Sequence, residues 1–226
     1  MKKKTIVHKF FEIDRKDRKM YMLQVTTIRT LIVAIVKFVF GVLYKSVWFF
    51  SNSIFYIILS FCRYRSIRDY RKVKRMKDKE LKRNITYRNY LYNGWLLVLL
   101  GIAYLGMNFF MYKSGVNNNN LGGYLVYLVA LISFSSFGTA IAGIVKYRRK
   151  NDPILAAVCQ SNIAMALTSI VLTQVVLLDE FCEKSIEIVK ADAITGMAVG
   201  AIIILLGIRM VVKIIRGGKN EINFTN

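Results

Sequence analysis

The sequence predicts an all-α polytopic membrane protein, with six transmembrane helices in one bundle and both termini in the cytoplasm. Its 226 residues are 55% hydrophobic, with a mean hydropathy of +0.39, which is typical of membrane proteins. Long apolar runs alternate with charged segments along the whole chain. Basic residues gather in alternate gaps, as the positive-inside rule describes for cytoplasmic loops. These observations together predict both the helical class and the topology.

The most basic segment is the expected cytoplasmic loop 63–89, between the second and third apolar runs. Between Arg63 and Arg88 it carries twelve Lys and Arg residues against three acidic ones. The inner segments of this topology hold 27 of the 34 Lys and Arg residues, and the outer loops hold four. Anionic lipid headgroups are therefore the expected partner, and nucleic acid is not. The residues expected to contact these headgroups are Arg63, Arg65, Arg68, Arg71, Lys72, Lys74 and Arg75.

The domain organisation follows from the same pattern. Residues 1–20 form a basic cytoplasmic segment, either an amphipathic helix on the inner leaflet or a disordered tail. The six-helix domain spans 21–215, and a short cytoplasmic tail covers 216–226. The first two apolar runs, 28–43 and 47–62, are each shorter than the roughly 20 residues of a usual span. A tight helical hairpin is the natural interpretation, with 21–27 lengthening its first helix.

Local signals place the other four helices. Tyr87, Tyr90, Tyr92 and Trp95 form an interfacial aromatic belt at the start of the third helix. Four consecutive asparagines at 117–120 favour a turn after this helix. Pro153 can begin the fifth helix, where its missing N–H is harmless. The expected ranges are 90–111, 122–145, 153–178 and 191–212.

The titratable residues argue against catalysis. All thirteen acidic residues fall in expected loops, tails or helix ends, Asp152 and Asp192 included, so no carboxylate is expected inside a helix. Proton-coupled and metal transporters usually need one there. His8 is the single histidine and has no partner for a metal site or a catalytic pair. The sequence therefore predicts no enzyme activity, no catalytic residue, no metal site and no cofactor.

Polar residues within the expected helices form the candidate site. Lys37 is the one cation well inside a helix, and it either snorkels to the outer interface or is held by amides across the bundle. A functional Lys37 would instead contact an anion or another substrate. The expected intramembrane cluster comprises Lys37, Asn52, Gln160 and Asn162.

The sixth expected helix carries a stripe of small residues. Ala193, Gly196, Gly200 and Gly207 are spaced 3, 4 and 7 apart, which keeps them on one helix face. Such stripes let helix backbones approach closely. We expect helix packing at this face, either within the bundle or across a homodimer seam.

Four short motifs are similar to those of a known family. They are Lys37-Phe-Val-Phe-Gly41 followed by Ser46, Ala166-Leu167-Thr168-Ser169, Asp192-Ala193-Ile194-Thr195 and Gly207-Ile208-Arg209. Over roughly 28–215 the chain thus resembles the transmembrane domain of cation diffusion facilitators. That resemblance implies metal ligands in two pairs, on helices two and five. In this sequence those positions hold Phe55, Leu59, Ser161 and Met165, of which only Ser161 is even a weak ligand.

A second set of motifs is similar to uncharacterised six-helix membrane proteins of Gram-positive bacteria. These motifs are Trp48-Phe49, Phe55-Tyr56-Ile57-Ile58-Leu59-Ser60, Arg63, Lys146-Tyr147-Arg148 and Pro153. This resemblance implies a multi-pass protein of the bacterial cytoplasmic membrane and brings no activity with it.

The sequence favours a non-enzymatic integral membrane protein with a transporter-like scaffold and an accessory, regulatory or assembly role. The alternative is a small-solute or ion transporter that does not use the usual metal site, for example one whose anion is recognised by Lys37. The bilayer with its anionic headgroups is the first expected partner. A homodimer or another membrane protein is the second.

Overall fold

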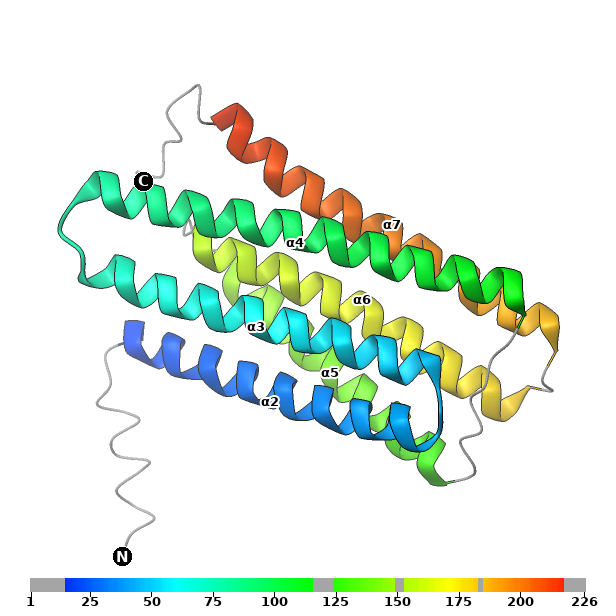
Figure 1. Ribbon diagram of the computed structural model, residues 1–226. Helices are drawn as coiled ribbons and strands as arrows, with labels where there is room; N and C mark the ends of the chain where they lie inside the picture. The colour runs from blue at the N-terminus through cyan, green and yellow to red at the C-terminus, as the bar shows by residue number, and fades with distance from the viewer. Residues whose placement is uncertain (1–14, 116–123, 149–152, 183–184, 218–226) are drawn as a thin grey trace, which may run out of the picture.

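The computed structural model describes residues 15–115, 124–148, 153–182 and 185–217, in which all regular structure is α-helical. The expected all-α class is therefore confirmed for these residues. Figure 1 shows the helices as an elongated bundle. They are α2 (Arg15–Leu43), α3 (Val47–Arg75), α4 (Lys79–Ser114), α5 (Tyr124–Arg148), α6 (Pro153–Phe181) and α7 (Ile186–Gly217).

Five of these helices are long and apolar enough to cross a membrane. The spanning segments are Leu23–Leu43, Lys79–Ser114, Val126–Val145, Pro153–Phe181 and Ile186–Arg216. Large apolar side chains also point outward: Leu131 is 70% exposed, and Phe134 and Leu205 are each 65% exposed. So much outward apolar surface suits contact with lipid and not with water. The fold is that of a multi-pass membrane protein.

The expected basic loop 63–89 is instead mostly helical. Helix α3 continues to Arg75 and α4 begins at Lys79, so only 76–78 separate them. Lys and Arg are good helix formers, and no Gly or Pro interrupts the segment. Asp78 begins α4 as its N-cap, and its side chain accepts a hydrogen bond from the Glu80 N–H at 2.9 Å. The basic region is thus two helical extensions joined by a short turn.

Other helix ends also differ from the expected ranges. Helix α2 begins at Arg15, inside the expected N-terminal segment, and α7 runs from Ile186 to Gly217, beyond both of its expected limits. Polar and charged residues can continue a helix past the bilayer, where water satisfies its outer surface. Apolar runs therefore understate helix length. The rest of the N-terminal segment (1–14), the asparagine turn and most of the C-terminal tail lie outside the described residues.

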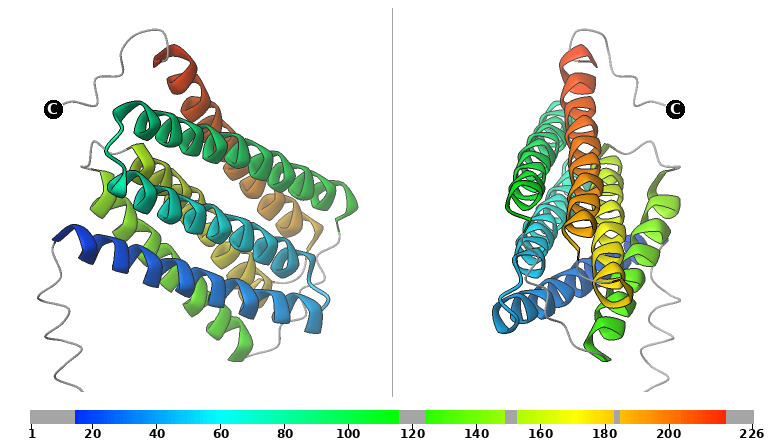
Figure 2. Two further views of the ribbon diagram at one scale, coloured as in Figure 1. Left: turned by 60° about the vertical axis from the view of Figure 1, so that its left-hand side comes forward. Right: turned by 90° about the vertical axis from the view of Figure 1, so that its right-hand side faces the viewer.

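The helices pack in three principal pairs, α2 with α3, α5 with α6, and α4 with α7. Helix α6 is central, because it also contacts α3, α4 and α7 (Figure 2). The expected hairpin of the first two helices is confirmed, with 44–46 as its turn. Lys45 in this turn has a φ of 51°, in the left-handed region. The two chain segments of the hairpin run antiparallel, which brings polar residues of α2 opposite polar residues of α3.

Candidate functional site: a polar layer inside the bundle

Midway along the bundle, polar and basic side chains occupy the interior shared by α2, α3, α5 and α6. We call this region the polar layer and define it by eight residues that make contacts between these helices. They are Arg29, Thr30 and Lys37 of α2, Tyr56 and Arg63 of α3, Thr139 of α5, and Asn162 and Ser169 of α6.

Arg63 lies at the centre of one half of this layer. Its side chain is 2% exposed and its guanidinium reaches two neighbouring helices. Nη1 donates to Thr30 Oγ1 at 3.1 Å, and Nη2 donates to Asn162 Oδ1. Nη2 also lies 3.6 Å from Met165 Sδ. A planar guanidinium suits this role because its donors diverge toward several acceptors at once.

Lys37 lies in the other half of the layer. It is 2% exposed, and its Nζ is buried without a hydrogen-bond partner among the described residues. The Nζ is held over the ring of Tyr56, 4.0 Å from the ring centroid. The Tyr56 hydroxyl in turn contacts Ser169 Oγ and lies 3.5 Å from the Met165 carbonyl oxygen. A cation–π contact satisfies an ammonium only in part, because all three N–H donors still lack acceptors.

Arg29 is a third basic residue of the layer. Its Nη2 donates to Thr139 Oγ1 and so joins α2 to α5. On α2, Thr30 lies seven residues before Lys37. On α3, Tyr56 lies seven residues before Arg63. Residues seven apart share a helix face and lie roughly 10 Å apart along the axis. The polar layer therefore extends over about two helical turns.

An apolar cluster closes each end of the polar layer. Toward the α2–α3 turn, one cluster comprises Phe49, Val126, Val129, Leu172 and Val176. Toward the opposite end, a second cluster comprises Leu23, Ile67, Leu155, Val158 and Cys159. The order of these residues along α2, α3 and α6 places the polar layer between the two clusters. The largely buried basic groups therefore lie between two packed apolar clusters.

The four residues of the expected cluster, Lys37, Asn52, Gln160 and Asn162, lie in the described helices but have other partners or unpaired polar atoms. Lys37 Nζ has no hydrogen-bond partner within the part of the chain that the structure describes, so none of the three amides holds it. Asn162 instead accepts from Arg63. Asn52 donates to the Trp48 carbonyl of its own helix at 3.0 Å, and its Oδ1 is buried without a partner, as is Gln160 Oε1. Lys37 does not snorkel to an interface either, because its whole side chain is buried.

Five residues of the layer were not among the expected site residues: Arg29, Thr30, Tyr56, Thr139 and Ser169. Arg63 was assigned to lipid contact, but its burial between helices removes it from the surface. Its position explains the difference: Arg63 follows the apolar run by one residue, and α3 continues through it inside the bundle. The sequence signal that could have indicated a buried Arg63 is its position directly after an apolar run. The other expected lipid-contact residues, Arg68, Arg71, Lys72, Lys74 and Arg75, are exposed, and Arg65 is half-buried over the Tyr92 ring.

The expectation that no carboxylate lies inside a helix is wrong: several acidic residues lie within the described helices, and Asp69 and Asp192 are buried there. Asp69 is 8% exposed within α3 and accepts a hydrogen bond of 2.8 Å from Asn89 Nδ2 of α4. Asp192 is 2% exposed within α7 and accepts from Gln174 Nε2 of α6 at 3.2 Å. Both helices extend beyond their apolar runs, which carries these acids into packed interfaces. Each of the two acids lies in a helix pair outside the polar layer as defined.

The positions that the family resemblance aligns with metal ligands are part of the packing. Phe55 and Leu59 are buried in the main hydrophobic cluster, together with Met165. The Ser161 hydroxyl donates to the Ala157 carbonyl at 3.2 Å. In the part of the chain that the structure describes, no group of three or more His, Cys, Asp or Glu residues could hold a metal ion.

The small-residue stripe of α7 faces α4. A Cβ on Gly200 would lie 3.1 Å from the backbone nitrogen of Leu105, and one on Gly207 would lie 2.8 Å from that of Val98. A Cβ on Gly196 would collide with Asn108. Ala193 is fully buried on the same face. The stripe therefore packs within the bundle.

Neither a scan against models of known protein families nor a search of curated proteins finds a match to this chain. The class of protein is defined by its fold: a multi-pass helical membrane protein with a buried basic layer between two pairs of helices.

Proposed function

We propose that this protein is a non-enzymatic membrane transporter for a small anion, with six spans, both termini in the cytoplasm, and the anion held in the polar layer. The observation that carries the proposal is Lys37, a buried lysine whose Nζ has no hydrogen-bond partner among the described residues. Isolating an ammonium from water costs several kcal/mol unless another group replaces its hydration. Ionisable residues inside a membrane bundle commonly mark the path of a substrate or ion.

The surroundings of Lys37 favour an anion over a metal cation. Buried Arg63 and half-buried Arg29 add two further positive charges beside this interior, where they donate to the neutral side chains of Thr30, Thr139 and Asn162. A small anion would offset the mutual repulsion of these cations and would accept from Lys37. The apolar clusters at both ends would then separate the anion from water on both sides. Opening one end at a time is what alternating access requires.

The sixth span of this proposal is α3. Its apolar part is short, but Thr30 lies opposite Arg63 and Lys37 lies opposite Tyr56, so α3 returns along α2 over the same depth. Burial against α2, α4 and α6 lets polar α3 residues avoid lipid. With six spans, the basic extensions of α3 and α4 lie on the cytoplasmic side, as the positive-inside rule favours. The family resemblances favour the same topology and a bacterial cytoplasmic membrane.

The proposal is tested by measuring thermal unfolding of the purified protein with different anions. Sodium chloride, nitrate, acetate and phosphate are each compared with sodium gluconate at equal ionic strength. We expect at least one small anion to raise the unfolding temperature saturably, since a ligand at 100 times its dissociation constant adds about 2.7 kcal/mol of stability. Proteoliposomes should then show flux of that anion.

Lys37→Met should remove both effects and remain folded, because an apolar residue of similar length is well tolerated at a buried charged site. Lys190→Met, at an exposed position of α7, provides the matched control and should behave as the wild type. If none of the four anions raised the unfolding temperature, the proposal of anion transport would be contradicted. The accessory or assembly role would then be the remaining candidate function. Equal stabilisation of the Lys37→Met protein would place the anion elsewhere.

A further inference from the structure

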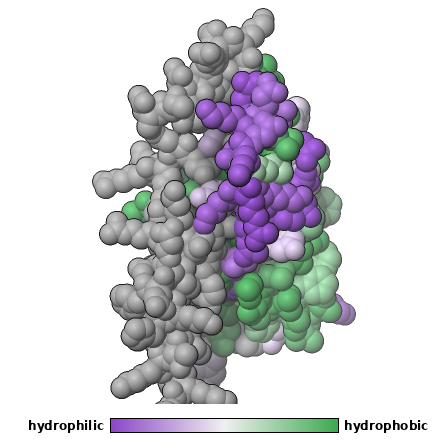
Figure 3. Space-filling view, turned by 90° about the vertical axis from the view of Figure 1, so that its left-hand side faces the viewer, coloured by the Kyte–Doolittle hydropathy of each residue, from purple (hydrophilic) through white to green (hydrophobic). Residues whose placement is uncertain are grey.

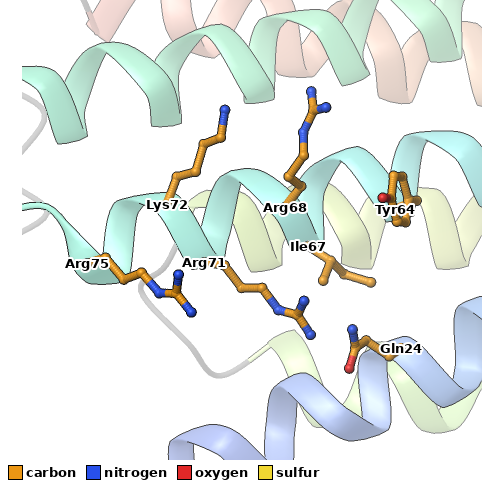
Figure 4. Close-up of a pocket in the computed structure, with 7 residues that line it drawn as sticks. All are labelled: Gln24, Tyr64, Ile67, Arg68, Arg71, Lys72 and Arg75. Atoms are coloured by element: carbon orange, nitrogen blue, oxygen red, sulfur yellow. The ribbon is translucent and has the colours of Figure 1, made fainter.

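A surface pocket of about 270 Å³ lies between the basic part of α3 and the first half of α2 (Figure 4). Its described lining comprises Gln24, Tyr64, Ile67, Arg68, Arg71, Lys72 and Arg75. In Figure 4, Arg71 and Arg75 point from α3 toward α2 and Gln24, while Arg68 and Lys72 extend in the opposite direction, toward α4. Four of the seven lining side chains are basic and none is acidic, so the pocket suits an anion.

The pocket continues an exposed stripe along α3. Ile57, Phe61, Tyr64, Arg68, Arg71 and Arg75 recur at three- and four-residue spacing and therefore share one helix face. The first part of this stripe is apolar or aromatic, with Phe61 59% exposed and Tyr64 60% exposed. Its last part is wholly basic. The surface thus changes from apolar to cationic within about three helical turns.

The neighbouring surface of α2 repeats the apolar part. Ile28, Leu31 and Ile35 are exposed and follow Gln24 at helical spacing. Seen from the end where α3 turns into α4, hydrophilic surface gathers in one zone and hydrophobic surface adjoins it below (Figure 3). A ligand with an anionic head and apolar chains would match both parts of this surface at once.

We propose that this pocket binds the phosphate headgroup of an anionic phospholipid, with an acyl chain lying along Ile57 and Phe61. Guanidinium groups pair with phosphate oxygens through two parallel N–H donors, and a lysine adds a point charge. Basic pockets on the cytoplasmic side of membrane proteins are suited to such headgroups. The site is distinct from the polar layer, because it lies on the outer surface of α3 and shares no residue with the layer.

The test compares two double variants that lose the same charge. Arg71→Gln/Arg75→Gln removes two pocket residues. Arg83→Gln/Arg88→Gln removes two exposed basic residues of α4 that do not line the pocket. The full chain, purified in a neutral detergent, is titrated with phosphatidylglycerol or phosphatidylcholine, and bound lipid is counted by native mass spectrometry.

We expect one phosphatidylglycerol to bind in preference to phosphatidylcholine. The pocket variant should bind it roughly 30-fold more weakly, because each basic residue near an anionic lipid surface contributes about 1 kcal/mol. The α4 variant should bind as the wild type does. Equal weakening of phosphatidylglycerol binding in both variants would show diffuse electrostatic attraction and would overturn the proposed pocket. Unweakened binding in both variants would also overturn it.

Two further arms distinguish the source of the phosphate and guard against misfolding. Millimolar inorganic phosphate should not displace the lipid, since it lacks the acyl chain; displacement would overturn the lipid assignment in favour of free phosphate. Phe61→Ser leaves every charge in place and should weaken retention of long-chain phosphatidylglycerol at least several-fold. Unchanged retention in this variant would overturn the placement of the acyl chain and the proposal with it.

Discussion

Inside the bundle, Lys37 Nζ lies over the ring of Tyr56, 4.0 Å from the ring centroid. A Tyr ring can attract a desolvated ammonium by roughly 2 kcal/mol, which offsets part of the cost of burying Lys37. The Tyr56 hydroxyl has a separate role, because it contacts Ser169 and thereby ties α3 to α6. The ring and the hydroxyl can be tested separately by two substitutions.

Tyr56→Phe keeps the ring over Lys37 and removes the hydroxyl. We expect it to lower the free energy of unfolding by about 1 kcal/mol, the usual net value of one hydrogen bond. For a chain of this size that is roughly 2–4 °C in the unfolding temperature. Tyr56→Leu also removes the ring and should cost several times more, because it leaves a cavity beside an unpartnered cation.

Thermal unfolding in detergent measures both variants, with Tyr64→Phe as the exposed control. If Tyr56→Leu were no worse than Tyr56→Phe, the ring would contribute nothing to holding Lys37.

At the scale of helices, the close approach of α4 and α7 is set by small residues on both partners. Gly94 and Gly101 of α4 face Gly207 and Gly200 of α7, so each backbone meets the other without an intervening side chain. Van der Waals packing of this kind is a main driving force between helices in lipid, where hydrophobic burial offers little. The pair depends on the absence of side chains at these positions.

Gly200→Leu should therefore prevent α4 and α7 from pairing and lower the yield of folded protein severalfold. The reason is that even a Cβ at this position would lie 3.1 Å from the Leu105 backbone nitrogen. Gly106→Leu on α4 is the matched control, since a Cβ there meets nothing within 4 Å. The yield of monodisperse protein in size-exclusion chromatography is measured for both variants. A normal yield of monodisperse Gly200→Leu protein would contradict the close contact.

A second helix pair is joined by polar groups. Asn89 donates to Asp69 at 2.8 Å, and Asn93 donates to Ser66 at 3.2 Å and to the Asn89 carbonyl at 2.8 Å. The hydrogen bonds from Asn89 to Asp69 and from Asn93 to Ser66 join α4 to α3 and hold the two helices side by side next to their basic extensions. Positive charges that repel one another can therefore remain on rigid helices, where they present fixed surfaces such as the pocket on α3.

For the whole molecule, the proposed six spans place the α3–α4 turn and Cys182 on opposite sides of the membrane. A membrane-impermeant maleimide should label Cys182 in intact cells, because this residue is exposed after α6. Cys62 and Cys159 are buried, so they do not report a side and can remain in place. A Lys79→Cys protein that also carries Cys182→Ser should be labelled only after the membrane is permeabilised. Labelling of Lys79→Cys in intact cells would contradict the proposed topology.

For the described residues, the apolar runs by themselves determined the helical class and the hairpin of the first two helices. They did so because any segment that crosses a bilayer must satisfy its own backbone hydrogen bonds, which requires a helix. Charge distribution indicated where the apolar runs end, although the helices extend beyond these runs, as at Arg75 and Ile186. Small residues at 196, 200 and 207 predicted a close contact but not its partner.

Only the tertiary structure decided which side chains meet inside. In a soluble helix an apolar stripe marks the buried face, but a membrane helix is apolar on its lipid-facing side as well. The sequence therefore leaves the rotation of each helix undetermined, and with it the partners of Lys37, Arg63 and Asp69. The antiparallel packing of α2 on α3, and the packing of α3 on α6, fix those rotations. That packing turns Arg63 inward toward Thr30 and Asn162, and it leaves Arg71 and Arg75 of the same helix at the surface.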